Sequence, residues 1–222
     1  GPATDCTGGT QGVLIPPAGE EDRCRLAAYF RRLVDGDPAT LAWSRGFVAA
    51  DHVQRTVIAA EQGIEVINLS FTFDLPLLTW RLARAGAGIS AWGGAAKFRM
   101  ASGQVLESYP LTHAIGQLMG HLEGVTRVER VALPDSAHRV YRLTRAAGPV
   151  WVAWLDRDRV LLPEDGTPGS PATLDLGALA VQVEPVITEM DRKTPRRTRH
   201  RTQDGRLILE LAHRPVYILP LE

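Results

Sequence analysis

The stretch DGRLILELAHRPVYILPLE, residues 204–222, decides the fold of this chain. It opens on Asp204-Gly205, continues through an apolar run, and ends on Pro215-Val216-Tyr217-Ile218. Asp-Gly is a hairpin signal, and β-branched and aromatic residues with a proline at an edge are typical of strands. The stretch therefore predicts two terminal strands that form the last hairpin of a β-sandwich.

The same pattern extends upstream to about residue 125. Short apolar or alternating runs are separated by turn signals such as Glu164-Asp165-Gly166, and the runs are TRVERVAL, HRVYRLT, PVWVAWLD, RVLLP, ATLDLG and LAVQVEPVIT. Short strands at regular spacing predict an antiparallel sandwich over 125–222. In PVWVAWLD the alternation puts Trp151 and Trp154 on opposite faces. We expect one of them inside the sandwich and the other outside it or toward the first half of the chain.

The first half, residues 1–124, mixes helical and strand patterns. EDRCRLAAYFRRLVDG has one apolar helical face and is ended by Gly36 and Pro38. YPLTHAIGQLMGHLEG, from 109 to 124, predicts a second strongly amphipathic helix ended by Gly124. The chain therefore divides near Gly124 into an α/β part and an all-β part.

A helix followed directly by a buried strand is predicted between these two helices. In DHVQRTVIAAEQG, Asp51 is the expected cap, Gln54 completes a capping box, and Gly63 ends the helix. IEVINLSFTFD reads as a buried strand from Ile64 to about Phe71. TLAWS, residues 40–44, is its one obvious neighbouring strand.

Composition limits the classes of function. The 222 residues carry 25 basic and 25 acidic side chains, so the zero net charge argues against nucleic acid as a partner. No apolar run approaches the roughly 20 residues that span a bilayer, so no membrane partner is expected, and no signal peptide is visible. Gly1-Pro2 resembles the remnant left by a protease, so we expect the natural start to lie elsewhere.

Cys6 and Cys24, the only two cysteines, flank a Gly/Pro-rich stretch. A disulfide between them is expected if the protein is exported, and two unpaired thiols are the alternative. The chain is then secreted or periplasmic if they are bonded and cytoplasmic otherwise. Neither a CxxC motif nor a suitably spaced histidine accompanies them, so we expect no metal and no cofactor.

The order of these patterns resembles the C-terminal part of clan A glycoside hydrolases, in which a β-sandwich follows a catalytic (β/α)8 barrel. The resemblance lies in VYRLTRAAGPVWVAWLDRDRVLLP, TLDLG, VEPVITEMD and DGRLILELAHRPVYILP for the sandwich, and in DHVQRTVIAAEQGIEVINLSFTFD and GQVLESYPLTHAIGQLMGHLEG for the end of the barrel. It implies a C-terminal portion of a barrel over 1–124 and the sandwich over 125–222.

The resemblance also implies that much of the enzyme is missing. A (β/α)8 barrel takes roughly 250 residues, so strands 1 to about 6 have no counterpart here. Retaining enzymes of this kind use two carboxylates about 5 Å apart. In the resembling families these carboxylates sit at the ends of barrel strands 4 and 7. The strand 4 carboxylate has no counterpart in this chain, and Asp5, near the place where strand 7 would end, cannot be assigned the nucleophile role. The catalytic residues are therefore unknown. We expect a carbohydrate substrate and a partner: the N-terminal barrel portion or a companion chain.

Loops at the carboxyl ends of barrel strands line the active site. In this interpretation the expected substrate-binding residues lie at the exit of strand 8 and in the long connection after it, because long connections are often functional loops. They are Asn68, Phe71, Phe73, Asp74 and Trp92. The structural alternatives are that the phenylalanines belong to the core, that Asp74 caps a turn, and that Trp92, like Trp80, packs the loop onto the body.

Two further features have a structural interpretation. His113 and His121 fall on one side of the predicted helix 109–124 and are expected to be surface or interface histidines. DRKTPRRTRHR, residues 191–201, suits a phosphate or an acidic glycan, but a solvated hairpin is the favoured interpretation.

Two functions remain open. The first is the C-terminal portion of a glycoside hydrolase that needs a missing barrel portion carrying at least one catalytic carboxylate, so that the chain alone is inactive. The alternative is a non-catalytic carbohydrate-binding or protein-interaction module.

Overall fold

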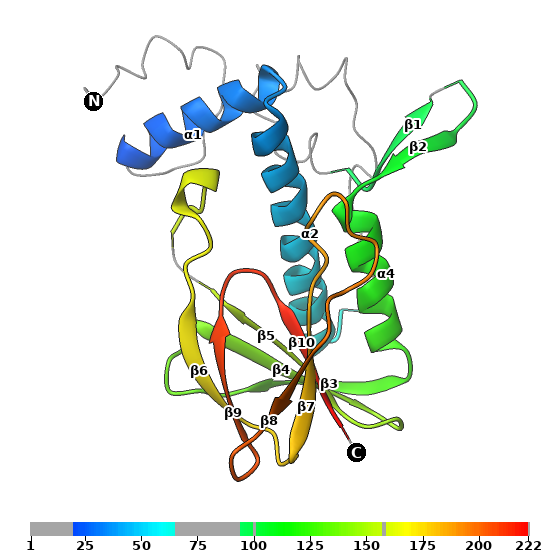
Figure 1. Ribbon diagram of the computed structural model, residues 1–222, viewed down its shortest axis with the longest axis vertical. Helices are drawn as coiled ribbons and strands as arrows, with labels where there is room; N and C mark the ends of the chain where they lie inside the picture. The colour runs from blue at the N-terminus through cyan, green and yellow to red at the C-terminus, as the bar shows by residue number, and fades with distance from the viewer. Residues whose placement is uncertain (1–19, 65–93, 100, 157–158, 222) are drawn as a thin grey trace.

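The computed structural model describes residues 20–64, 94–99, 101–156 and 159–221 (Figure 1). Within them the chain forms three long helices, a hairpin and two further antiparallel sheets. The helices are α1 (Glu20–Val34), α2 (Pro38–Glu61) and α4 (Pro110–Leu122). The hairpin of β1 (Ala96–Arg99) and β2 (Gln104–Ser108) projects beside the start of α4 (Figure 1).

The larger sheet has six antiparallel strands in the order β3-β4-β5-β10-β7-β8. Their bounds are Val125–Val131 for β3, His138–Arg145 for β4, Val150–Leu155 for β5, Val216–Pro220 for β10, Ala180–Pro185 for β7 and Thr198–Arg201 for β8. A smaller sheet pairs β6 (Ser170–Asp175) with β9 (Arg206–Leu211). The α/β plus antiparallel sandwich class predicted from the sequence therefore describes the fold.

β5 lies inside the six-stranded sheet and is buried along its whole length. Trp151 faces the smaller sheet, in a cluster with Leu174 and Leu207. Trp154 faces the helices and stacks on Tyr141, with the ring centroids 5.2 Å apart. The prediction that the two tryptophans occupy opposite faces is confirmed.

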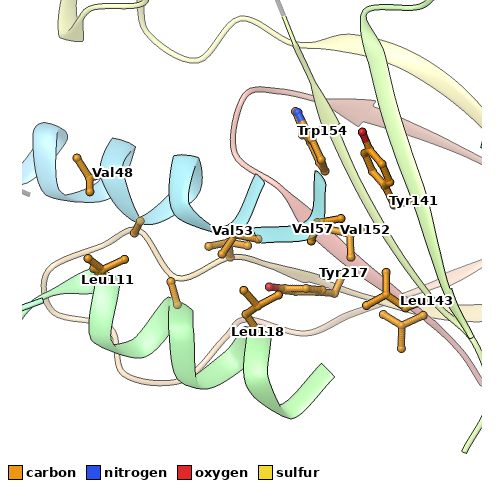
Figure 2. Packing of buried hydrophobic residues seen from close by; sticks show 14 residues of the cluster. Val48, Val53, Val57, Leu111, Leu118, Tyr141, Leu143, Val152, Trp154 and Tyr217 are labelled. Carbon is orange, nitrogen blue, oxygen red and sulfur yellow. The ribbon is translucent and has the colours of Figure 1, made fainter. Parts of the chain in front are cut away.

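The helices cover the second face of the six-stranded sheet (Figure 2). Val53 and Val57 of α2 and Leu118 of α4 meet Val152 and Tyr217 of the sheet. Because this cluster contains residues from both sides of Gly124, the helices and the sheet share one hydrophobic core. Gly124 lies between α4 and β3, and the division of the chain at this residue stays a prediction.

The helix predicted from Asp51 begins thirteen residues earlier. Asp37 is the observed cap: its side chain accepts a hydrogen bond of 2.7 Å from the Thr40 amide, and Pro38 occupies the first turn. Asp51 lies inside α2 and pairs with Arg55. The strand predicted over 40–44 was wrong for the same reason, since those residues are helical.

One other strand prediction was wrong, and a second falls almost wholly outside the described residues. Ile64 is not in a strand and is 54% exposed, whereas the rest of the predicted strand lies outside the described residues. RVLLP, from 159 to 163, is irregular and leads into the short 3-10 helix Pro163–Asp165. Asp165 and Glu164 there pair with Arg25, so this segment anchors α1.

The terminal stretch turns as predicted but does not form one hairpin. Asp204 and Gly205 both have positive φ, 51° and 76°, and Gln203 and Arg206 exchange backbone hydrogen bonds across them. β8 before the turn belongs to the large sheet and β9 after it to the small one. β10 then returns to the large sheet between β5 and β7. The turn therefore passes the chain from one layer of the sandwich to the other.

Candidate functional site

The first half of α2 presents aromatic side chains toward the C-terminal segment. The Asp37 cap and Pro38 start the helix early enough for Trp43 and Phe47, four residues apart, to share one face. The Trp43 and Phe47 rings stack with centroids 4.9 Å apart, and Phe47 stacks on His213 at 4.5 Å. Tyr29 of α1 meets Trp43 edge-on at 5.6 Å. Four rings from three segments thus form a continuous series.

This aromatic series borders two adjoining cavities. One has a volume of about 220 Å³ and is also lined by Gly46, Thr188 and Arg214. The other is about 210 Å³ and is also lined by Asp156 and Arg159. Trp43, Phe47, Leu161 and His213 line both, and we call the pair the aromatic cavities.

His213 is the polar group common to both cavities. Its Nδ1 lies 3.4 Å from the Gln54 amide nitrogen, and the same nitrogen donates to the His213 carbonyl at 2.6 Å. Nδ1 therefore acts as the acceptor, and the neutral ring carries its proton on Nε2. That buried Nε2 finds no acceptor among the described residues. Burial lowers the pKa of His213, against the smaller opposing effect of Asp51 and Asp156, which favours this neutral form.

An ion pair fixes the wall beside His213. Arg214 donates to both carboxylate oxygens of Glu189 at 2.9 Å and to the Val186 carbonyl at 2.6 Å. Burial alone would raise the pKa of Glu189, but the hydrogen bonds and charge of Arg214 outweigh it and lower that pKa. Gly46 of α2 faces the same wall, where an added Cβ would lie 2.5 Å from the Thr188 carbonyl oxygen. The arrangement holds the 186–189 segment tightly against α2.

The substrate-binding residues expected from the sequence, Asn68, Phe71, Phe73, Asp74 and Trp92, lie outside the described residues. Cys24 takes part in a disulfide, whereas Cys6 also lies outside them, so the pairing of the two stays a prediction. Sequence analysis did not single out Trp43, Phe47 or His213. The i, i+4 spacing of Trp43 and Phe47 was the available signal, and it was lost when residues 40–44 were assigned to a strand.

The described ranges hold no group of three or more histidine, cysteine, aspartate or glutamate side chains that would fit a metal ion. None of the helices within them combines the length and apolar character needed to cross a membrane.

Neither a protein-family model nor a curated protein matches the chain. Two solved structures are similar to parts of it. A GH30 endoxylanase from Clostridium papyrosolvens C71 shares 15% identity over 57% of this chain and 30% of its own, with a TM-score of 0.37. Xyn30A from Clostridium acetobutylicum, a glycoside hydrolase family 30 subfamily 8 xylanase, shares 11% over 79% of this chain and 39% of its own, with a TM-score of 0.42. The chain spans less than half the length of either xylanase.

Proposed function

We propose that this chain is the C-terminal portion of a glycoside hydrolase and that it binds carbohydrate in the aromatic cavities. The observation that supports binding is the junction of the two cavities, where His213 stacks on Phe47 next to Trp43 and its Nε2 meets no partner within the described ranges. Ligand sites are mostly apolar and aromatic with a few placed polar groups. The order of helices followed by a sandwich supports the glycoside hydrolase assignment.

Each part of the site suits a feature of a sugar. The C–H faces of a pyranose are apolar and pack on Trp43 and Phe47, whereas its hydroxyls need hydrogen-bond partners in a buried place. His213 offers a donor, and Arg159 and Asp156 offer a donor and an acceptor at the rim of the second cavity. The predicted residues Asn68, Phe71, Phe73, Asp74 and Trp92 remain proposed contributors to the catalytic pocket.

Carbohydrate binding is tested by calorimetric titration of the whole chain with xylohexaose and with cellohexaose. We expect saturable binding of at least one probe, and a loss of tenfold or more in affinity for Trp43→Ala. His213→Gln should weaken binding less, because the glutamine amide replaces the donor. The absence of binding by both probes would refute binding in the aromatic cavities.

The matched control removes an aromatic ring that lines neither cavity. Phe98→Ala in β1 should leave affinity within twofold of the original. Because Trp43 also packs on Tyr29 and Phe47, thermal unfolding of Trp43→Ala is recorded in parallel, and Trp43→Phe tests the site with a ring retained. Equal losses for Trp43→Ala and Phe98→Ala would argue against a specific role of the cavities.

Hydrolysis is proposed to require the missing barrel portion, which would carry at least one catalytic carboxylate. The 1–124 part would then be the end of the barrel and 125–222 the sandwich. Intact-mass analysis of the protein from its natural source tests this: we expect either a longer polypeptide or a companion chain with glycosidase activity. A complete, active protein of 222 residues would contradict it.

The second candidate is a non-catalytic carbohydrate-binding module. The observation that favours it is that α2 and α4 bury their apolar faces on the sheet of this same chain. Both candidates share the aromatic cavities, so binding does not separate them. Recovery of glycosidase activity on adding the companion portion does, since a module would bind without gaining turnover.

A further inference from the structure

A third cavity, which we call the α4 cavity, is lined by α4 and by the 186–197 segment that follows β7. Its volume is about 430 Å³, larger than either aromatic cavity. Among the residues that line it, His113, Gln117 and His121 come from α4, Glu184 from β7, and Lys193 and Arg197 from the basic run. None of the residues that line the aromatic cavities is shared with it.

Two glycines leave the α4 side of this cavity open. Gly116 and Gly120 sit between the polar residues on the same helix face, and a Cβ added at either would meet no atom within 4 Å. Glycine inside a helix is less favourable than alanine, and no close approach of another segment requires it here. Glycine at these two positions therefore leaves space beside α4 and lowers the stability of the helix. Packing against another segment does not explain why glycine is present there.

The polar frame of the cavity is fixed by hydrogen bonds. Gln117 accepts from the Ile187 amide at 3.2 Å and donates to the Pro185 carbonyl at 3.3 Å. Glu184, only 2% exposed, accepts from Gln182 and lies 3.3 Å from Nε of Arg197. It also lies 3.8 Å from Nε2 of His121. Burial alone would raise the pKa of Glu184, but the hydrogen bond and charge of His121, the charge of Arg197 and the hydrogen bond from Gln182 outweigh it and lower that pKa.

The cavity is lined by two cationic side chains, Lys193 and Arg197, and by one carboxylate, that of Glu184. Arg197 lies with Nε 3.3 Å from Glu184, and its side chain is 62% exposed, so its guanidinium is accessible from solvent. Lys193 is exposed and lines the same cavity. Burial and then the charge of Lys193 lower the pKa of His113, so the field of this ammonium extends into the cavity. A pocket lined by surplus positive charge attracts anions.

We infer that the α4 cavity is a binding site for a phosphate or sulfate group, held by Lys193 and by the terminal nitrogens of Arg197. Arginine presents parallel N–H groups that match two oxygens of such an anion, and lysine adds a point charge. Glu184 holds Arg197 in place through Nε. His121 and His113 line the same space as further hydrogen-bonding groups. The inference does not depend on the carbohydrate function, because the two sites share no residue.

Calorimetric titration of the whole chain with inorganic phosphate, at constant pH and ionic strength, tests the site. We expect saturable binding that weakens at least fivefold in Lys193→Gln. Arg197→Gln should weaken it as much or more. Arg199→Gln is the control: it removes the same charge from β8 at a position outside the cavity, and should change affinity less than twofold.

A second variant tests the space rather than the charge. Gly116→Leu should fill the cavity and abolish phosphate binding while thermal unfolding shows a folded protein.

A parallel titration with glucose 6-phosphate separates a free ion from a phosphate carried on a larger molecule, since the tighter ligand identifies the source. No saturable binding of either compound, or equal weakening by Lys193→Gln and Arg199→Gln, would overturn the inference.

Discussion

At the scale of single residues, two helix glycines that look alike in the sequence have opposite surroundings. Gly46 of α2 touches the Thr188 backbone, whereas Gly116 of α4 faces open space. Replacing glycine by alanine inside a helix stabilises a protein by about 0.4–1 kcal/mol when the space exists. The two positions therefore form a matched pair in which only the space beside the glycine differs.

We predict that Gly46→Ala destabilises the protein by about 1–3 kcal/mol, because the methyl group forces α2 and the 186–189 segment apart. Gly116→Ala should stabilise it by up to about 1 kcal/mol. Urea unfolding monitored by circular dichroism measures both changes. Equal effects of the two substitutions would show that the packing of α2 on Thr188 is not as described.

His213 predicts a dependence of stability on pH. Its pKa is lowered in the folded state, chiefly by burial, so the unfolded chain binds a proton first as the pH falls. The contribution of His213 to the free energy of unfolding should therefore be constant above the ordinary histidine pKa. It should decrease as the pH drops from about 7 to about 5. Urea unfolding at several pH values should give a shallower decrease for His213→Gln, and an unchanged slope would contradict the assignment. His113, whose pKa is also lowered, contributes the remaining slope.

The sequence predicts the position of a residue in the fold where local periodicity decides which face of an element it occupies. Trp151 and Trp154 were assigned to opposite faces because a strand alternates, and the core clusters contain them on those faces. His213 could not be found in this way. Its significance comes from Phe47 and Gln54, which are more than 150 positions away in the chain and meet it only in the fold.

At the scale of elements, the Arg214–Glu189 pair holds the entry to β10 against the segment after β7. We predict that a double-mutant cycle of Arg214→Met and Glu189→Gln gives a coupling of about 1 kcal/mol, as expected for a partly exposed pair in direct contact. The pKa of Glu189 is lowered in the folded state, so this contribution is present above the ordinary glutamate pKa. It is lost as the pH falls through the lowered value. Additive single substitutions would contradict the coupling.

Helices with a strongly periodic apolar pattern were predicted well, whereas the first residue of α2 was not. α4 was expected over 109–124 and spans Pro110–Leu122. The early start of α2 was missed because Asp51 and Gln54 match a capping box, while the true cap, Asp37, precedes a proline that was read as the end of the previous helix. β8 lies in a basic run with little apolar character, and it forms because β7 offers it an edge.

At the scale of the whole molecule, the six-stranded sheet depends on the helices. Its helix-facing side carries Tyr141, Val152 and Trp154, all buried in the described structure. We predict that residues 125–222 produced alone retain β-sheet circular dichroism but aggregate or bind a hydrophobic dye, because removing α2 and α4 exposes this face. A soluble, monomeric fragment with the thermal stability of the whole chain would show that the two parts are independent.

The central claim is that this chain holds carbohydrate but needs a further portion for hydrolysis. The most direct test is the rate at which the pure 222-residue chain releases the chromophore from aryl glycosides. The account predicts a rate equal to that of the buffer alone, with no change in Glu184→Gln, the variant that removes the one carboxylate of the α4 cavity. Turnover above the buffer rate that is abolished by changing an acidic residue of this chain would contradict the account.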